Sequence, residues 1–267
     1  MNLGNLDFHG IYAVFGPWIL TFVLALVRVG SLFIIAPLFS MRAVPSVIKL
    51  GVVGTLTLMV MSTLQPRLDL MQFGAFEIAG AVLTEALVGG IMGFAVMILF
   101  GALAFTGQLI GIQMGFAIAN VVDPSTQQQS GILSQVLNIF GLALFLAVDG
   151  HLVLLKALFQ SFETVPLGGA DPQQMVLLNA LIKQGADIFS LGLKIGLPVV
   201  CVVLLVNVGL ATLARTVPQI NIFVIGFLIT ISIGLLLLAL AIPTTGDVFT
   251  KLIEDTLRNG VALIQFF

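Results

Sequence analysis

Long runs without any charged residue set the strongest limit on how this chain can fold. Residues 86–122 form a run of 37 without Asp, Glu, Lys or Arg, and residues 216–246 and 124–148 form runs of 31 and 25. The hydrocarbon core of a bilayer is about 30 Å thick, and about 20 helical residues cross it. Each run can therefore hold a membrane-length helix, and the first is longer than one span requires.

The composition excludes most other classes of protein. The 267 residues include 10 basic and 12 acidic ones, which is 8% charged, and 59% are apolar. A single soluble domain has too small an interior for so much apolar side chain, and a disordered chain has too little of it. The single Cys201 and the net charge of −2 argue against a disulfide scaffold and a nucleic-acid binder. We predict an all-α integral membrane protein whose N-terminus is not a cleaved signal peptide, since no basic residue precedes Arg28.

Turn-forming and polar residues divide the chain into about six hydrophobic segments. We expect a last amphipathic helix at 247–267, after Pro243, and a tight corner at 215–219. The polar connection 166–172 is the predicted seam between an N-terminal half, 1–165, and a C-terminal half, 173–267. Basic residues divide almost evenly between the two sides, so they leave the orientation open. The six segments are 11–39, 44–64, 76–105, 132–159, 188–214 and 220–242.

The sequence carries no recognisable catalytic, nucleotide-binding or metal-binding motif. We therefore expect no enzyme activity, no metal and no cofactor. Four charges lie within or beside the apolar segments: Arg28, Lys49, Glu85 and Lys194. A charge inside the hydrocarbon core of a membrane is energetically costly. Such a residue either pairs with a polar group of a neighbouring helix or extends its charge to the membrane–water interface, or else it belongs to a proton or substrate relay. Only Glu85 is a fair relay carboxylate, which argues against a proton-coupled carrier.

The segment 107–124 combines glycines with amides inside the longest charge-free run. Gly107, Gly111 and Gly115 are spaced so that they form one stripe on a helix, and small residues at this spacing let helices approach closely. Gln108, Gln113 and Asn120 accompany them, and glycine weakens a helix. The segment is therefore either a packing face or a bent, re-entrant element, which must be buried in protein or face water.

Motifs in a fixed order resemble the FliR family of flagellar export-gate proteins. They cover most of the chain, from Arg28 to Phe227. The first are Arg28-Val29, Ala36-Pro37, Arg42-Ala43-Val44-Pro45 and Lys49-Leu50-Gly51; the central ones are Gly111-Ile112-Gln113-Met114-Gly115 and Val122-Asp123-Pro124; the last are Gly150-His151-Leu152, 214–220 and 223–227.

The resemblance implies a subunit of the type III secretion core at the flagellar basal body in the bacterial inner membrane. A single copy would join FliP and FliQ in a closed helical assembly, with FlhB and FlhA as further partners and flagellar polypeptides as the exported cargo. The N-terminal half would be FliP-like and the C-terminal half a FliQ-like hairpin. The assembled core lies largely above the membrane, so apolar segments would contact partner subunits as well as the lipid bilayer.

The resemblance also assigns a loop inside the closed pore and a set of assembly residues. Arg215 beside Pro218 is expected at the tip of the hairpin, where a guanidinium can bond carbonyls or a partner carboxylate. Two alternatives to an export-gate subunit remain. One is a stand-alone secondary transporter of a small solute, which should show internal repeats and charged residues at the membrane midplane. The other is an intramembrane enzyme. The predicted pore residues are Gly111, Gln113, Met114, Gly115, Phe116, Ile118, Val121, Val122 and Asp123, the packing glycines are Gly107, Gly111 and Gly115, and the assembly contacts are Arg28, Arg42, Lys49, Arg215 and Pro218.

Overall fold

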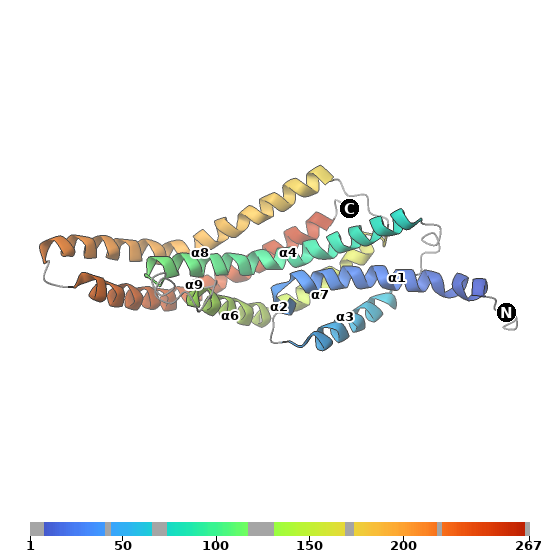
Figure 1. Ribbon diagram of the computed structural model, residues 1–267, viewed down its shortest axis with the longest axis horizontal. Coiled ribbons are helices and arrows are strands. Elements are labelled where there is room, and N and C mark those ends of the chain that lie inside the picture. Colours follow the sequence, from blue (N-terminus) through green and yellow to red (C-terminus); the bar gives the residue numbers. More distant parts are fainter. Residues whose placement is uncertain are drawn as a thin grey trace. The chain divides into compact units, whose positions relative to one another are not determined.

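The computed structural model describes residues 8–40, 44–65, 74–116, 131–168, 174–217 and 221–264, and these are helical without a strand (Figure 1). The prediction of an all-α chain of long apolar helices is confirmed. The helices are α1 (Phe8–Ile35), α2 (Pro37–Ser40), α3 (Ser46–Met61), α4 (Ala75–Gln113), α6 (Ile132–Ala147), α7 (Gly150–Thr164), α8 (Gln174–Thr216) and α9 (Ile222–Ile264).

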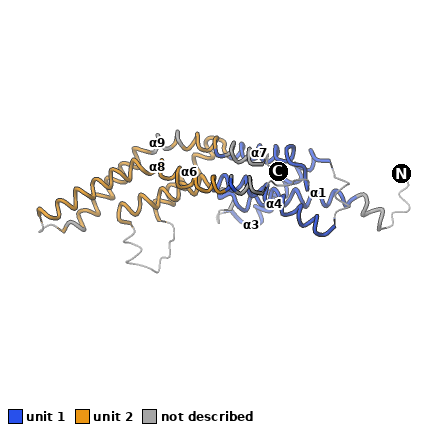
Figure 2. The backbone as a smooth tube through the Cα atoms, turned by 90° about the horizontal axis from the view of Figure 1, so that it is seen from above, with its two compact units in different colours: residues 1–97, 151–181, 256–267 blue, residues 98–150, 182–255 orange. Residues whose placement is uncertain are grey.

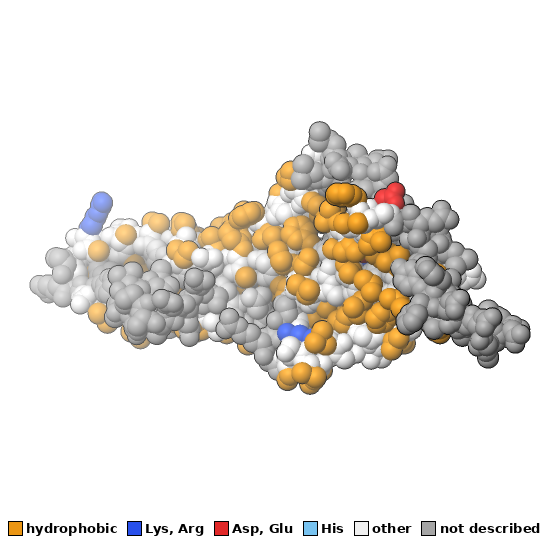
Figure 3. Space-filling view, turned by 45° about the vertical axis from the view of Figure 1, so that its right-hand side comes forward, with side chains coloured by type: hydrophobic (Ala, Val, Ile, Leu, Met, Phe, Trp, Pro, Cys, Tyr) orange, Lys and Arg blue, Asp and Glu red, His pale blue; other side chains and the backbone are white. Residues whose placement is uncertain are grey.

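Several described helices are long and apolar enough to cross a membrane. Among the described residues four qualify by length and composition, within α1, α4, α8 and α9. A fifth is added if the bent pair α6 and α7 counts as one span. Hydrophobic side chains cover much of the molecular face drawn in Figure 3, and charged ones are few there.

Helix boundaries differ from the expected segments at several places, of which three concern α4, α8 and α9. The helix expected at 76–105 continues to Gln113, and the one expected at 188–214 begins at Gln174. The expectation of a separate terminal helix at 247–267 is wrong, because α9 runs without a break through Pro243 to Ile264. A proline removes one helical hydrogen bond, and apolar membrane-type helices tolerate such a loss. Prolines also lie inside two other helices of this chain, Pro17 in α1 and Pro198 in α8.

The segment expected at 132–159 is two helices with a 66° bend between them. Asp149 stands at the bend with a φ of 56°, a left-handed conformation that Asp tolerates better than most residues. The next residue is Gly150, where a Cβ would lie 2.7 Å from the ring of Phe145. The close ring and the left-handed residue together explain why the helix stops here.

The described chain forms two compact units, coloured in Figure 2. Unit 1 consists of residues 1–97, 151–181 and 256–267, and unit 2 of residues 98–150 and 182–255. The seam at 166–172 falls between α7 and α8, and the corner at 215–219 falls between α8 and α9. Each unit takes segments from both sides of the seam, and the division into halves at 165 and 173 stays a prediction.

Glycines allow close helix contacts within each unit. In unit 1, a methyl group at Gly89 of α4 would overlap the carbonyl oxygen of Arg28 in α1. In unit 2, a Cβ at Gly107 of α4 would lie 2.5 Å from the backbone of Ser134 in α6, and one at Gly192 of α8 would lie 2.9 Å from the carbonyl oxygen of Ala102. Unit 2 adds a hydrogen bond of 2.8 Å from the Thr106 hydroxyl to the Gly192 carbonyl.

Candidate functional site

The C-terminal end of α4 carries the described part of the predicted pore segment. The amide of Gly115 donates to the Ile112 carbonyl at 3.1 Å, and the amide of Phe116 donates to the Gly111 carbonyl at 3.0 Å. This pair of bonds is the Schellman motif, which needs a left-handed residue next to the helix end. Gly115 supplies it with a φ of 86°.

The next two carbonyls of this helix end are met by side chains from α8 and α9. Asn207 of α8 donates its side-chain Nδ2–H to the Gln113 carbonyl at 3.1 Å. The Thr230 hydroxyl of α9 lies 3.3 Å from the Met114 carbonyl and 2.9 Å from the Gly226 carbonyl of its own helix. The last four carbonyls of a helix have no partner within it. At this end three of the four have a donor of their own, and the Met114 carbonyl shares the Thr230 proton with the Gly226 and Phe227 carbonyls.

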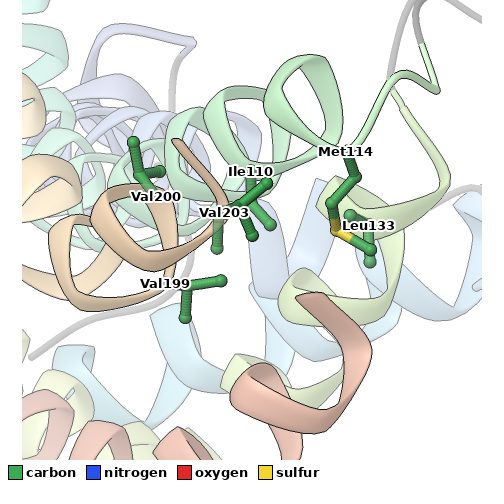
Figure 4. Packing of buried hydrophobic residues seen from close by; sticks show 6 residues of the cluster. All are labelled: Ile110, Met114, Leu133, Val199, Val200 and Val203. Carbon is green, nitrogen blue, oxygen red and sulfur yellow. The ribbon is translucent and has the colours of Figure 1, made fainter. Parts of the chain in front are cut away.

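A buried apolar cluster in unit 2 surrounds the helix end. Met114 is fully buried and lies beside Leu133 of α6, while Ile110 faces Val203 of α8 (Figure 4). A Cβ at Gly234 of α9 would lie 2.6 Å from the Met114 sulfur, so this glycine makes room for the side chain. The cluster consists of Ile110, Met114, Leu133, Val199, Val200 and Val203.

Phe116 is the last described residue before the chain continues to 117–130. Its ring is half-buried, packs against the cluster, and meets the Phe227 ring edge-on at 6.4 Å between centroids. The predicted pore residues Ile118, Val121, Val122 and Asp123 lie outside the described residues. Among the described residues of the predicted pore set, Met114 is buried in the apolar cluster of unit 2, and Gln113 is the last residue of α4.

The three glycines of the predicted stripe have different surroundings. Gly107 is in close contact with α6, as the packing interpretation expects. Gly111 leaves ordinary room, since a Cβ there would be 3.8 Å from the Leu133 side chain. Gly115 terminates the helix.

Arg28 and Glu85 form a second polar site, buried inside unit 1. Nε of Arg28 donates to Oε2 of Glu85 at 2.5 Å, and the two side chains are 0% and 1% exposed. The pairing interpretation is thus confirmed for Arg28. The other guanidinium nitrogens donate to the carbonyls of Ser161 at 2.8 Å and Val165 at 3.1 Å, near the end of α7.

The second oxygen of Glu85 is also occupied. The amide of Gly168 donates to Oε1 at 2.9 Å, and Gly168 has a φ of 66°. The Phe162 ring lies under the guanidinium, 4.4 Å from Cζ to the ring centroid, a favourable cation–π distance. A carboxylate with both oxygens bonded inside the protein serves to hold α1, α4 and α7 together.

The remaining predicted charges lie on helix surfaces or outside the described residues. Lys194 and Arg215 of α8 are exposed, and Arg215 stands in the last turn before the corner. Lys49 of α3 is half-buried, while Arg42 and Pro218 lie outside the described residues. The described residues contain no group of three His, Cys, Asp or Glu side chains arranged to hold a metal ion.

Sequence reasoning did not identify Asn207 and Thr230. A signal for Asn207 was present, since residues 195–211 are otherwise glycine or apolar apart from Cys201. An amide in such a helix needs a partner on a neighbouring helix. Thr230 gave no comparable signal, because threonine in a helix ordinarily bonds a carbonyl of its own preceding turn.

Comparisons with known proteins agree with the motifs. Residues 19–256 match the family model of bacterial export proteins, family 1. The flagellar biosynthetic protein FliR of Escherichia coli (strain K12) is 36% identical over 226 residues, which cover 85% of each chain. The FliR protein of Bacillus subtilis (strain 168) is 32% identical over 251 residues, covering 91% of this chain and 95% of the relative. This chain therefore belongs to the bacterial export proteins of family 1, together with the flagellar biosynthetic proteins FliR.

Proposed function

We propose that this chain is a structural and gating subunit of the flagellar type III export gate in the bacterial inner membrane, without enzymatic activity. Family membership makes it a flagellar export-apparatus protein with membrane helices. We further propose that it assembles with FliP and FliQ, and with FlhB and FlhA at the same gate, to pass flagellar polypeptides. A stand-alone solute transporter has no support in these observations.

The observation that carries the assembly proposal is the uncovered surface of α8 and α9. In the span of α4, 72% of the most apolar window is buried within the chain, but in the spans of α8 and α9 only 17% is. Apolar surface of that extent is covered either by lipid or by protein. Neighbouring helices of an export gate would cover it in the assembled state.

Co-purification tests the assembly proposal directly. The tagged chain would be expressed with and without FliP and FliQ, and the eluates compared by size-exclusion chromatography and subunit composition. A stable particle is expected only with both partners, and the gene should restore motility to a strain that lacks its own FliR. A stable monomer that ignores both partners would contradict the proposal.

We also propose that 111–123 is part of the seal of the closed export pore. An apolar constriction excludes ions, because an ion that enters it loses its hydration. The helix end supports this proposal, because the bonds within 111–116 and the packing against the cluster anchor the start of the segment. The sequence after Phe116 offers apolar side chains for the seal, among them Ile118, Val121 and Val122. Deleting 118–122 leaves both the helix end and the buried Met114 in place.

Conductance of purified complexes in planar bilayers tests the seal. The deletion of 118–122 and Phe116→Ala should each raise ion leakage through particles that contain all subunits. Phe189→Ala is a matched control, since Phe189 also makes an edge-on aromatic pair in unit 2, with Phe105. Intact particles that stay tight after the deletion would rule the seal out.

A further inference from the structure

We infer that Asn207 and Thr230 are positioning residues of the gate, through which the α8–α9 hairpin fixes the end of α4. The inference rests on the proposed seal, and it assigns to the hairpin a role besides contact with partner subunits. It concerns the described residues Gln113 to Phe116, which lie in the first part of the predicted pore segment 111–123, where α4 ends.

The four carbonyls at this helix end depend on two different sources of donors. Gly111 and Ile112 receive amides from Gly115 and Phe116, so these bonds form within the segment itself. Gln113 and Met114 receive donors only from α8 and α9 among the bonds described. The local bonds set the shape of the turn, whereas the other two tie the turn to the hairpin.

The packing around the Met114 side chain also connects the end of α4 to α9. Thr230 and Gly234 lie one turn apart on α9, so they share one face of that helix. Thr230 faces the Met114 carbonyl, and Gly234 leaves space for its fully buried side chain. One face of α9 therefore accommodates both the backbone and the side chain of a single residue.

Displacing the hairpin relative to the helix end has a defined cost. Two carbonyls would lose their donors in apolar surroundings, where an unsatisfied polar group is destabilising. Of the two, the Asn207 bond is the stronger constraint, because the single Thr230 proton is shared with two nearer carbonyls of α9, those of Gly226 at 2.9 Å and Phe227 at 3.1 Å. A movement of the α8–α9 hairpin would thus be transmitted to the end of α4 through the side chains of Asn207 and Thr230.

The test uses isosteric removal of the donors in the assembled complex. Asn207→Leu and Thr230→Val keep the branched shape of each side chain and remove the donor, and Thr230→Ser keeps the hydroxyl. Thr250→Val is the matched control, since Thr250 of α9 donates to Gly246 of its own helix at 2.9 Å and has no described bond to α4. Each purified complex is measured for subunit composition and for ion leakage.

Leakage of intact complexes should rise up to about tenfold in Asn207→Leu, as expected for the loss of one partly buried hydrogen bond. The rise should be smaller in Thr230→Val, and absent in Thr230→Ser and Thr250→Val. Equal leakage from Thr230→Val and Thr230→Ser would overturn the inference. So would failure of both donor-removing variants to assemble while Thr250→Val assembles, because the two side chains would then serve assembly.

The deletion of 118–122 separates this inference from the proposed seal. If that deletion leaks while Asn207→Leu and Thr230→Val stay tight, the seal holds and the positioning role is refuted. If the deletion itself stays tight, the seal is wrong and the inference falls with it.

Discussion

Removing both partners of the buried Arg28–Glu85 pair should cost unit 1 much less stability than the two single removals added together. Glu85→Leu leaves a buried guanidinium without its carboxylate, while the contacts with the Ser161 carbonyl and hydroxyl, the Val165 carbonyl and the Phe162 ring remain. Arg28→Met leaves a buried carboxylate with only the Gly168 amide. An uncompensated buried charge of this kind costs about 3–5 kcal/mol.

The double variant Arg28→Met/Glu85→Leu removes both charges and so avoids that cost. The Val165 carbonyl and the Gly168 amide then lose the partners described here, at about 1–3 kcal/mol each. The Ser161 carbonyl keeps the Val165 amide, which donates to it at 3.0 Å. The double variant should therefore lose much less stability than the sum of the two single variants, which is the signature of direct coupling.

Thiol labelling can measure the opening in the assembled complex. Cys201 is the only cysteine of the chain, so replacing it with Ser gives a silent background. Ala95 of α4 is fully buried in unit 1, and Ala95→Cys would report each opening as a chance for alkylation. A loss of 3–5 kcal/mol predicts a rise in alkylation rate of about two to four orders of magnitude.

Glu77→Leu supplies the control for this experiment. Glu77 lies on the same helix but is exposed, and its carboxylate accepts a hydrogen bond from the Gly74 amide at 2.7 Å. Its replacement should change the alkylation rate at Ala95→Cys by only a few-fold. Strictly additive effects of Arg28→Met and Glu85→Leu would refute the coupling argued from this geometry.

Three shorter tests concern a close helix contact, the hairpin tip and the isolated chain. Gly89→Ala should lower the melting temperature of the complex, because the forced overlap with α1 costs about 1–3 kcal/mol of stability. Gly80→Ala is the control, since a methyl group there has open space and should leave the melting temperature unchanged. Equal shifts in the two variants would contradict the close contact. Arg215→Ala should lower the yield of assembled complex, and normal assembly with a selective loss of secretion would show another role. The chain purified alone in detergent should show a broad thermal unfolding transition. A sharp, cooperative transition would show that it folds without partners and would contradict this expectation.

Helix content followed from the sequence because long apolar runs leave few other solutions, but helix ends depended on tertiary partners. The extension of α4 to Gln113 is an example: Gly107 and Gly111 weaken a helix, yet contact with α6 and donors from α8 and α9 stabilise it there. The sequence of α4 itself contains no sign of these donors, which lie about 90 residues or more further along the chain. The same holds for α9 at Pro243, where the helix continues despite the proline.

The two candidate sites were predictable to different degrees. Arg28 and Glu85 stood out as charges in apolar segments, and their pairing was one of two open interpretations. The end of α4 was included in the predicted pore segment, but the assignment of Met114 as a pore residue did not anticipate its complete burial. Burial of a single methionine depends on which helix face meets α6 and α9. The sequence 107–116 mixes glycines and apolar residues with two glutamines, Gln108 and Gln113, and does not by itself single out that face.

The uneven burial of the helices has a consequence for biosynthesis. Translation runs from the N-terminus, so α8 and α9, whose spans are buried least, leave the ribosome after α4, whose span is buried most. If partner subunits cover these faces, as proposed, the time for which they lack a protein neighbour is set by the arrival of those subunits and not by the folding rate of this chain. A cell that makes this protein in excess should accumulate it as a substrate for membrane proteases, and its abundance should follow that of its scarcest partner.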